Sequence, residues 1–209
     1  MRKLSGITTL LLVVGILFFS CEEYNINRGE SIKVGELKNM DYRLYDTVIT
    51  NFYNYKVSFD LDADMDGIAD FRFYSEHEGS PSFSRYKLYL FCLHENVFIG
   101  GESRDSLMYI DDGDTFYYSM DFNCINRFQS NELISVEDQW LSDTFNLIYD
   151  HWSVSSPTVT HSFRMEQIPY LETVFIGFKI TKSKKEKLGW MTVSNDNNGI
   201  TIHESAIQK

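Results

Sequence analysis

The sequence predicts an all-β protein, an antiparallel β-sandwich of the jelly-roll or immunoglobulin-like kind. Short runs rich in Val, Ile, Tyr and Phe recur along the chain, and residues typical of turns separate them. Several runs alternate in polarity, so that Val57, Phe59 and Leu61 fall on one side of an extended strand. Aromatic residues make up 15% of the chain and prolines number only three, which favours a packed core over a disordered stalk.

Nine segments have this strand pattern: 44–50, 53–61, 71–75, 86–93, 97–99, 115–120, 174–181, 189–194 and 199–203. The segment 131–152 is different, because some of its apolar residues fall near helical spacing. These are Ile134, Leu141, Phe145, Ile148 and Trp152, with Asn131 as an N-cap. Its β-branched and aromatic residues suit a strand equally well. The sequence therefore leaves one short helix and extended structure as alternatives in the middle of the chain.

The last three predicted strands form a C-terminal meander. In the first of them, Val174, Ile176, Phe178 and Ile180 make one apolar face. Gly177 and Gly189 are expected to leave room for a large neighbour such as Trp190 or Phe175. The four lysines of the turn at 182–187 are read as a solvated hairpin tip, although an acidic glycan or lipid headgroup could also contact them.

The first twenty residues have the three-part layout of a secretory signal. Basic Arg2 and Lys3 precede an apolar stretch at 7–19, which ends in Ser20 beside Cys21. This stretch is shorter than the ~20 residues that a membrane-spanning helix needs. The pattern favours cleavage before Cys21 over a permanent transmembrane anchor.

The run at 17–21 resembles a bacterial lipoprotein signal, in which fatty acids such as palmitate anchor the new N-terminal cysteine. Phe18 stands where such signals usually carry an aliphatic residue, and the alternative is an ordinary signal peptide with an incidental cysteine. Several acyl chains give stable membrane attachment, whereas one gives only marginal binding. Glu22 and Glu23 resemble the acidic tags that direct some lipoproteins to the cell surface. The resemblance implies a lipid-anchored protein of the outer membrane of a Gram-negative bacterium.

The predicted organisation is a signal peptide at 1–20, a lipid anchor and flexible tether at 21–40, and a single domain at 41–209. The tether is polar and aperiodic and would reach up to about 60 Å at ~3.3 Å per residue. Without Arg2 and Lys3 the chain keeps 17 basic residues against 30 acidic ones, a net charge of −13. Such a charge repels phosphate backbones, which excludes nucleic acid as the expected partner.

Two cysteines follow the tether, Cys92 and Cys124. In an exported protein they form a candidate disulfide, which would contribute roughly 3 to 4 kcal/mol by restricting the unfolded chain. The alternative is two buried thiols, since the sequence does not show whether their Cα atoms come within bonding reach.

The strongest local motif is the acidic loop at 62–70. Asp62, Asp64, Asp66 and Asp70 alternate along a tight turn, and Gly67 permits its sharp bend. Calcium takes six to eight oxygen ligands in flexible geometry. We therefore predict a structural calcium site in which these four aspartates supply carboxylate oxygens and Ile68 supplies its backbone carbonyl.

The loop is not an EF-hand, because Phe73 stands where the bidentate glutamate would fall and the flanking segments read as strands. Its spacing resembles the short calcium loops of thrombospondin type 3 repeats. The alternative is an acidic hairpin turn without metal. Four carboxylates within nine residues would repel one another without a cation, which favours the metal.

Together, the signal, the acidic loop and the last 35 or so residues resemble small exported bacterial lipoproteins of unassigned function. These carry an Asp-x-Asp-x-Asp-Gly-Ile-x-Asp loop and a C-terminal Gly-Trp meander. The resemblance leaves the middle of the chain uncovered. It implies a β-sandwich with calcium and assigns no catalytic residue.

Motifs for catalysis are weak in this sequence. Each of its three His-Glu pairs lacks the second histidine of a zinc protease helix, and no Gly-x-Ser-x-Gly elbow occurs. The leading hypothesis is a noncatalytic envelope module that binds a glycan or an envelope protein, with Trp140 or Trp152 as stacking platforms. The alternatives are a polysaccharide hydrolase with paired carboxylates and a structural subunit of a larger assembly.

Overall fold

A computed structural model describes residues 31–50, 54–104, 107–111, 114–118, 122–156, 159–196 and 199–209. These residues form β-strands and connecting loops, and no helix occurs among them. The strands are β1 (Ser31–Lys33), β2 (Met40–Thr50), β3 (Lys56–Leu61), β4 (Phe71–Ser80), β5 (Phe83–Cys92), β6 (Val97–Arg104), β7 (Leu107–Asp111), β8 (Asp114–Tyr118), β9 (Phe122–Ile125), β10 (Arg127–Phe128), β11 (Leu133–Ser135), β12 (Trp140–Leu141), β13 (Thr144–Ser156), β14 (Val159–Glu166), β15 (Thr173–Lys182), β16 (Lys185–Asp196) and β17 (Gly199–Gln208). The all-β prediction is confirmed.

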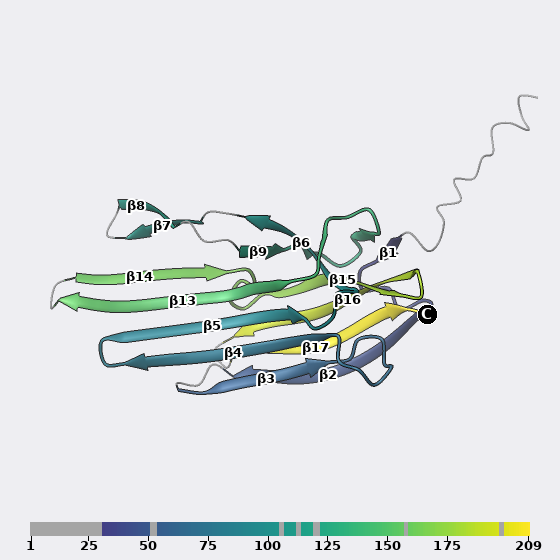
Figure 1. Ribbon diagram of the computed structural model, residues 1–209, viewed down its shortest axis with the longest axis horizontal. Helices are drawn as coiled ribbons and strands as arrows, with labels where there is room; N and C mark the ends of the chain where they lie inside the picture. The colour runs from purple at the N-terminus through teal and green to yellow at the C-terminus, as the bar shows by residue number, and fades with distance from the viewer. Residues whose placement is uncertain are drawn as a thin grey trace, which may run out of the picture.

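Ten strands follow one hydrogen-bonded path, in the order β2-β17-β16-β15-β6-β9-β13-β5-β4-β3. Its two end strands approach each other, since the rings of Tyr45 in β2 and Phe59 in β3 lie 5.8 Å apart (Figure 1). The β9–β13 pair is parallel at Phe145 and Asn123, and the other pairs of the path are antiparallel. A nearly closed, barrel-like mixed sheet therefore stands where the sequence predicted two sheets of a sandwich.

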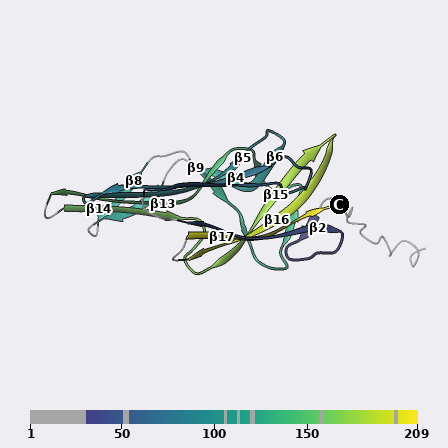
Figure 2. The same cartoon turned by 90° about the horizontal axis from the view of Figure 1, so that it is seen from below.

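The main core lies inside this sheet. Phe71, Phe73, Leu88 and Leu90 are fully buried there and alternate with outward-facing residues along β4 and β5, and Phe145 of β13 is buried with them. In two views the strands β13 and β14 extend to the end of the molecule opposite the C-terminus (Figures 1 and 2). Among the described residues, no helix has the length and hydrophobicity needed to cross a membrane.

A second apolar group, the outer cluster, consists of Ile32, Val34, Met40, Ile134, Leu188, Trp190 and Ala206. Its first three residues belong to the segment 31–40, in which β1 pairs with β11. The sequence analysis placed this segment in a flexible tether. Its apolar residues are few, but they are spaced so that they bury against the meander, and the packed part of the chain begins by Ser31 rather than near residue 41.

The middle of the chain is extended, so the helical alternative for 131–152 is wrong. A register shift between Asn146 and Ile148 in the β13–β5 pairing inserts one extra residue into β13. A bulge of this kind reverses the alternation of side chains. Phe145 and Ile148 therefore point to the same face at a spacing of three, which imitates helical periodicity.

Each of the nine predicted segments overlaps an observed strand. The two glycines of the meander leave space for aromatic side chains, as predicted, but the neighbours are different ones. A Cβ on Gly189 would lie 2.3 Å from the Phe178 ring, and a Cβ on Gly177 would lie 2.9 Å from the Phe128 ring. The expected partners, Phe175 and Trp190, pack against each other instead.

Candidate metal centre

The acidic loop joins β3 to β4 at the end of a hairpin whose last strand residues, Leu61 and Phe71, are fully buried. Two residues of the loop have positive φ, Met65 at 63° and Gly67 at 91°. Gly67 adopts this conformation without steric cost because it has no Cβ. The buried strand ends and these two reversals fix where the loop begins, turns and ends.

Side-chain carboxylates organise the loop by accepting hydrogen bonds from its own backbone. Asp62 accepts from the N–H groups of Asp66 and Gly67, at 3.2 and 2.9 Å. Asp64 accepts from Asp66 at 3.3 Å, and Asp66 accepts from Ile68 at 2.9 Å. Alternate aspartates thereby turn their carboxylates toward the inside of the turn, which is how short calcium loops present oxygen ligands.

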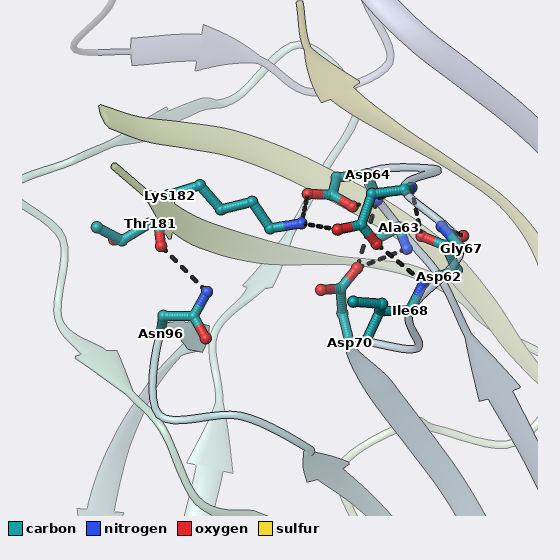
Figure 3. Close-up of polar contacts among 10 residues, drawn as sticks. Asp62, Ala63, Asp64, Gly67, Ile68, Asp70, Asn96, Thr181 and Lys182 are labelled. Carbon is teal, nitrogen blue, oxygen red and sulfur yellow. Dashed lines mark hydrogen bonds and ion pairs between the residues drawn. The ribbon is translucent and has the colours of Figure 1, made fainter. Parts of the chain in front are cut away.

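Three of the carboxylates converge. Asp62, Asp64 and Asp70 each offer an oxygen atom, and these atoms all lie within 4.8 Å of one another (Figure 3). Metal–oxygen distances for calcium are about 2.3–2.6 Å, so one cation can contact all three. Hard carboxylate oxygens without imidazole or thiolate suit calcium or magnesium rather than zinc or copper.

Asp70 is the buried member of this group, with only 2% of its surface exposed. Its carboxylate accepts hydrogen bonds from the N–H groups of Ala63 at 2.8 Å and Asp64 at 3.4 Å. The net pKa of Asp70 is raised to about 6, chiefly by burial and also by the nearby charge of Asp64, while the two hydrogen bonds lower it. A cation at this position would favour the ionised form.

The other two predicted ligands, Asp66 and Ile68, are not part of the group of converging carboxylates. The Asp66 carboxylate pairs with the Lys182 ammonium and is not part of the convergent group. Ile68 donates its N–H to Asp66 and exposes 57% of its side chain, and the expected role of its carbonyl stays a prediction.

Lys182, at the end of β15, is a site residue that the sequence analysis missed. Its ammonium forms an ion pair with Asp64 (Figure 3). It forms a second ion pair with Asp66. Partial burial lowers the pKa of Lys182, but the hydrogen bonds to the two aspartates outweigh this effect, and the net pKa is raised. The sequence carried no signal for the contact, because 116 residues separate Lys182 from Asp66.

Hydrogen bonds from β2 and from the segment after β5 hold the acidic loop in place. The hydroxyl of Tyr45 in β2 donates to the Asp62 carbonyl at 3.2 Å and lies 3.2 Å from the hydroxyl of buried Ser205 in β17. The N–H of Leu93 donates to the Asp70 carbonyl at 2.9 Å. The loop follows β3, one end strand of the nearly closed sheet, and Tyr45 links it to β2, the other end strand.

The cysteines do not join. Cys92 and Cys124 are free thiols, in β5 and β9. Because β13 lies between these strands, their Cα atoms are separated by at least roughly 10 Å, beyond the reach of a disulfide. Burial raises the pKa of the Cys92 thiol to about 12, so it is expected to be unreactive. Cys21 lies outside the described residues.

Other candidates from the sequence are placed as follows. Trp140 packs against the outer cluster, and its indole N–H donates to the Val136 carbonyl at 3.1 Å. Trp152 lies half-buried in β13. The structure also brings together three residues that the sequence did not suggest as a group: Ser194 lies 2.8 Å from Nε2 of His203, and Asp46 lies 3.8 Å from Nδ1, too far for the hydrogen bond that orients the base of a hydrolase triad.

The sequence matches no known family model, and neither a curated protein nor a solved structure is significantly similar to it.

Proposed function

We propose that this chain is an exported lipoprotein, anchored through acylated Cys21, whose β domain binds a structural calcium ion and serves as a noncatalytic binding or assembly module of the cell envelope. The observation that carries the calcium assignment is the convergence of Asp62, Asp64 and Asp70 within 4.8 Å. The signal-like N-terminus supports the location. A net charge of −13 after cleavage favours partners other than nucleic acid.

The burial of Asp70 favours a bound metal over an acidic turn exposed to water. A carboxylate that is 2% exposed loses hydration, and only two backbone N–H groups replace it. A divalent cation offsets this cost and the mutual repulsion of the aspartates. Calcium modules outside cells bind at about 10⁻⁴ to 10⁻³ M, which suits an ion with a structural role.

Thermal unfolding with and without a chelator tests the calcium assignment. We expect the midpoint to rise when millimolar calcium replaces EGTA, and the D62N and D70N variants to lose most of that rise. E78Q is the matched control, because it removes a carboxylate of β4 outside the loop. A wild-type midpoint that calcium leaves unchanged would show the loop to be only a turn.

The anchor is tested separately, by metabolic labelling with an alkyne palmitate in the native host. The wild-type protein should become labelled and fractionate with the outer membrane, whereas C21A should do neither. Equal labelling of both would contradict lipidation at this residue. Crosslinking in intact cells then tests for an envelope protein as the binding partner, and glycan arrays with the purified protein test for a glycan.

One observation favours the hydrolase as a second candidate. Asp150 in β13 lies opposite Arg164 in β14, so that Glu166 occupies the diagonal position, where Cα atoms lie about 7–8 Å apart. Inverting glycosidases place their two carboxyl groups about 6.5–9.5 Å apart, a separation that side chains at such positions can reach. Burial raises the pKa of Asp150, as a general acid requires. Release of reducing sugars from envelope polysaccharide, abolished in D150N, would support this candidate.

A further inference from the structure

Lys182 brings a positive charge from a distant part of the chain to the acidic loop. Its ammonium pairs with Asp64 (Figure 3) and also with Asp66. The Asp64 side chain is only 7% exposed, whereas that of Lys182 is 43% exposed. A nearly enclosed carboxylate of the candidate metal centre is therefore already paired with a cation that belongs to the protein.

The position of this lysine is fixed by its neighbours. The Thr181 N–H donates to the Asn96 carbonyl at 2.9 Å, and the Asn96 side chain donates to the Thr181 carbonyl at 3.0 Å. The same connection between β5 and β6 holds the metal loop, because the N–H of Leu93 donates to the Asp70 carbonyl. One short segment thus aligns the end of β15 with the acidic loop.

The other lysines of the turn do not share this arrangement. Lys184 and Lys185 are exposed, and the structure shows no ion pair for either among the residues that it describes. The contact of Lys182 is therefore a specific one and not a general consequence of a basic hairpin tip beside an acidic loop.

Both oxygens of Asp64 are engaged in this arrangement. Oδ1 accepts from the N–H of Asp66, and Oδ2 pairs with Lys182. A calcium ion bound to Asp64 would lie a few ångströms from the ammonium, and two cations at that separation repel each other strongly in a partly buried site.

We infer that Lys182 is a built-in counter-cation that competes with calcium for Asp64, so that metal binding displaces its ammonium from the loop. The inference rests on the proposed calcium site and adds its regulation. The lysine keeps the metal-free loop folded by neutralising part of its charge, and it sets a weak affinity for the metal.

Isothermal titration of the full-length protein in detergent with calcium chloride tests this competition. K182M should bind calcium on the order of tenfold more tightly than the wild type, because one unit of competing charge is removed. K185M removes the same charge from the same turn and should stay within about twofold of the wild type. Terbium emission sensitised by Tyr45, whose hydroxyl lies 3.2 Å from the Asp62 carbonyl, gives an independent readout of binding.

The outcomes separate the two proposals. Equal affinities of K182M and K185M would overturn the competition and leave the calcium site standing. Binding by K182M alone would overturn calcium as a resident ion of the wild type and support the competition. Absence of binding in all three proteins would overturn both.

Lysine-resolved NMR of the wild type tests the displacement without a substitution, which covers the case of a variant that fails to fold. Calcium should shift the side-chain signal of Lys182 and leave that of Lys185 in place. A Lys182 signal that stays unchanged at saturating calcium would count against displacement.

Discussion

Burial and charge oppose each other at Asp70. Its carboxylate is almost completely enclosed, and its pKa is raised to about 6 from the usual 3.8. The folded state therefore holds a proton on Asp70 over a pH range in which the unfolded chain has released it. Where the folded state binds more protons, stability falls as the pH rises.

The titration of Asp70 should accordingly lower the stability of the metal-free protein as the pH rises from about 4 to about 6. A pKa raised by about two units corresponds to roughly 3 kcal/mol of unfolding free energy, fully present below pH 4 and lost above pH 6. Urea unfolding in EGTA at four pH values measures this change in the unfolding free energy. D70N removes the titrating group but keeps an oxygen for the Ala63 N–H, so its profile should lack this decline. Parallel profiles of the two proteins would contradict the burial argument.

Gly189 is required by close packing rather than by a turn. A Cβ at this position would meet the Phe178 ring at 2.3 Å and the Ala206 carbonyl oxygen at 2.6 Å. Overpacking of this kind costs about 1–3 kcal/mol. We expect G189A to lower the unfolding free energy by that amount in chemical denaturation. G100A is the control, because its Cβ would have ordinary contacts of 3.6 Å or more and should change stability much less.

At the level of single residues, the sequence predicted the part of the site that is local. Asp62, Asp64 and Asp70 lie within nine positions, and their alternation carries the geometry. Lys182 could not be predicted, because its contact depends on how β15 lies against the loop that follows β3. The position of the Asp66 carboxylate could not be predicted either, because it pairs with the distant Lys182 and lies outside the convergent group.

At the level of elements, alternation predicted strands well where no bulge interrupts them. Val57, Phe59 and Leu61 share the face that their spacing indicated, and they lie beside the buried residues of β4. In β13 the extra residue between Asn146 and Ile148 breaks the period of two, so the pattern imitated a helix. A single-residue insertion of this kind depends on the neighbouring strand and leaves no reliable mark on the sequence.

Side-chain amides hold the junction of β9 and β13, where Asn123 donates to the Thr144 carbonyl at 3.0 Å and Gln167 makes three further hydrogen bonds. Gln167 accepts the Ile125 N–H at 2.5 Å and donates to the carbonyls of Asn123 and Asn146 at 2.8 and 2.7 Å. The two strands themselves share only one paired position. The amide of Gln167 therefore replaces the missing ladder of backbone hydrogen bonds between them.

Substitution of this glutamine should open the junction. Q167L removes the hydrogen bonds that Gln167 makes with three backbone groups, at a cost of about 1–3 kcal/mol for each group that it leaves unsatisfied and out of reach of water. We expect a loss of about 3 kcal/mol in denaturant unfolding and faster amide exchange at Ile125. Q139L, on an exposed side chain, should stay within about 0.5 kcal/mol of the wild type. Slow exchange at Ile125 in Q167L would contradict this role.

At the level of the whole molecule, the first and last described segments of the chain pack together on one face. The segment 31–40 covers the outer face of the meander, where Val34 and Met40 pack with Trp190 and Ala206. Composition did not predict this, because the segment is polar on average and only its tertiary contacts bury its few apolar residues. Under the proposed lipid anchor, the first described strand belongs to the domain, and at most ten residues of sequence separate Cys21 from β1.

Two truncations of the mature chain distinguish a packed segment from a tether. Deletion of residues 22–30 should leave the unfolding midpoint unchanged. Deletion of 22–40 exposes the face around Trp190 by removing buried Ile32, Val34 and Met40, and each such side chain is worth about 1.5–3 kcal/mol in burial. The entropy cost of ordering the segment offsets part of this burial free energy in the intact protein. We therefore expect the deletion of 22–40 to lower the unfolding free energy by about 3 kcal/mol. Tryptophan fluorescence should also shift to the red, because Trp190, now 1% exposed, would contact water. Equal unfolding midpoints for the two truncations would show that residues 31–40 do not stabilise the domain, and the domain would then begin near residue 41 as the sequence predicted.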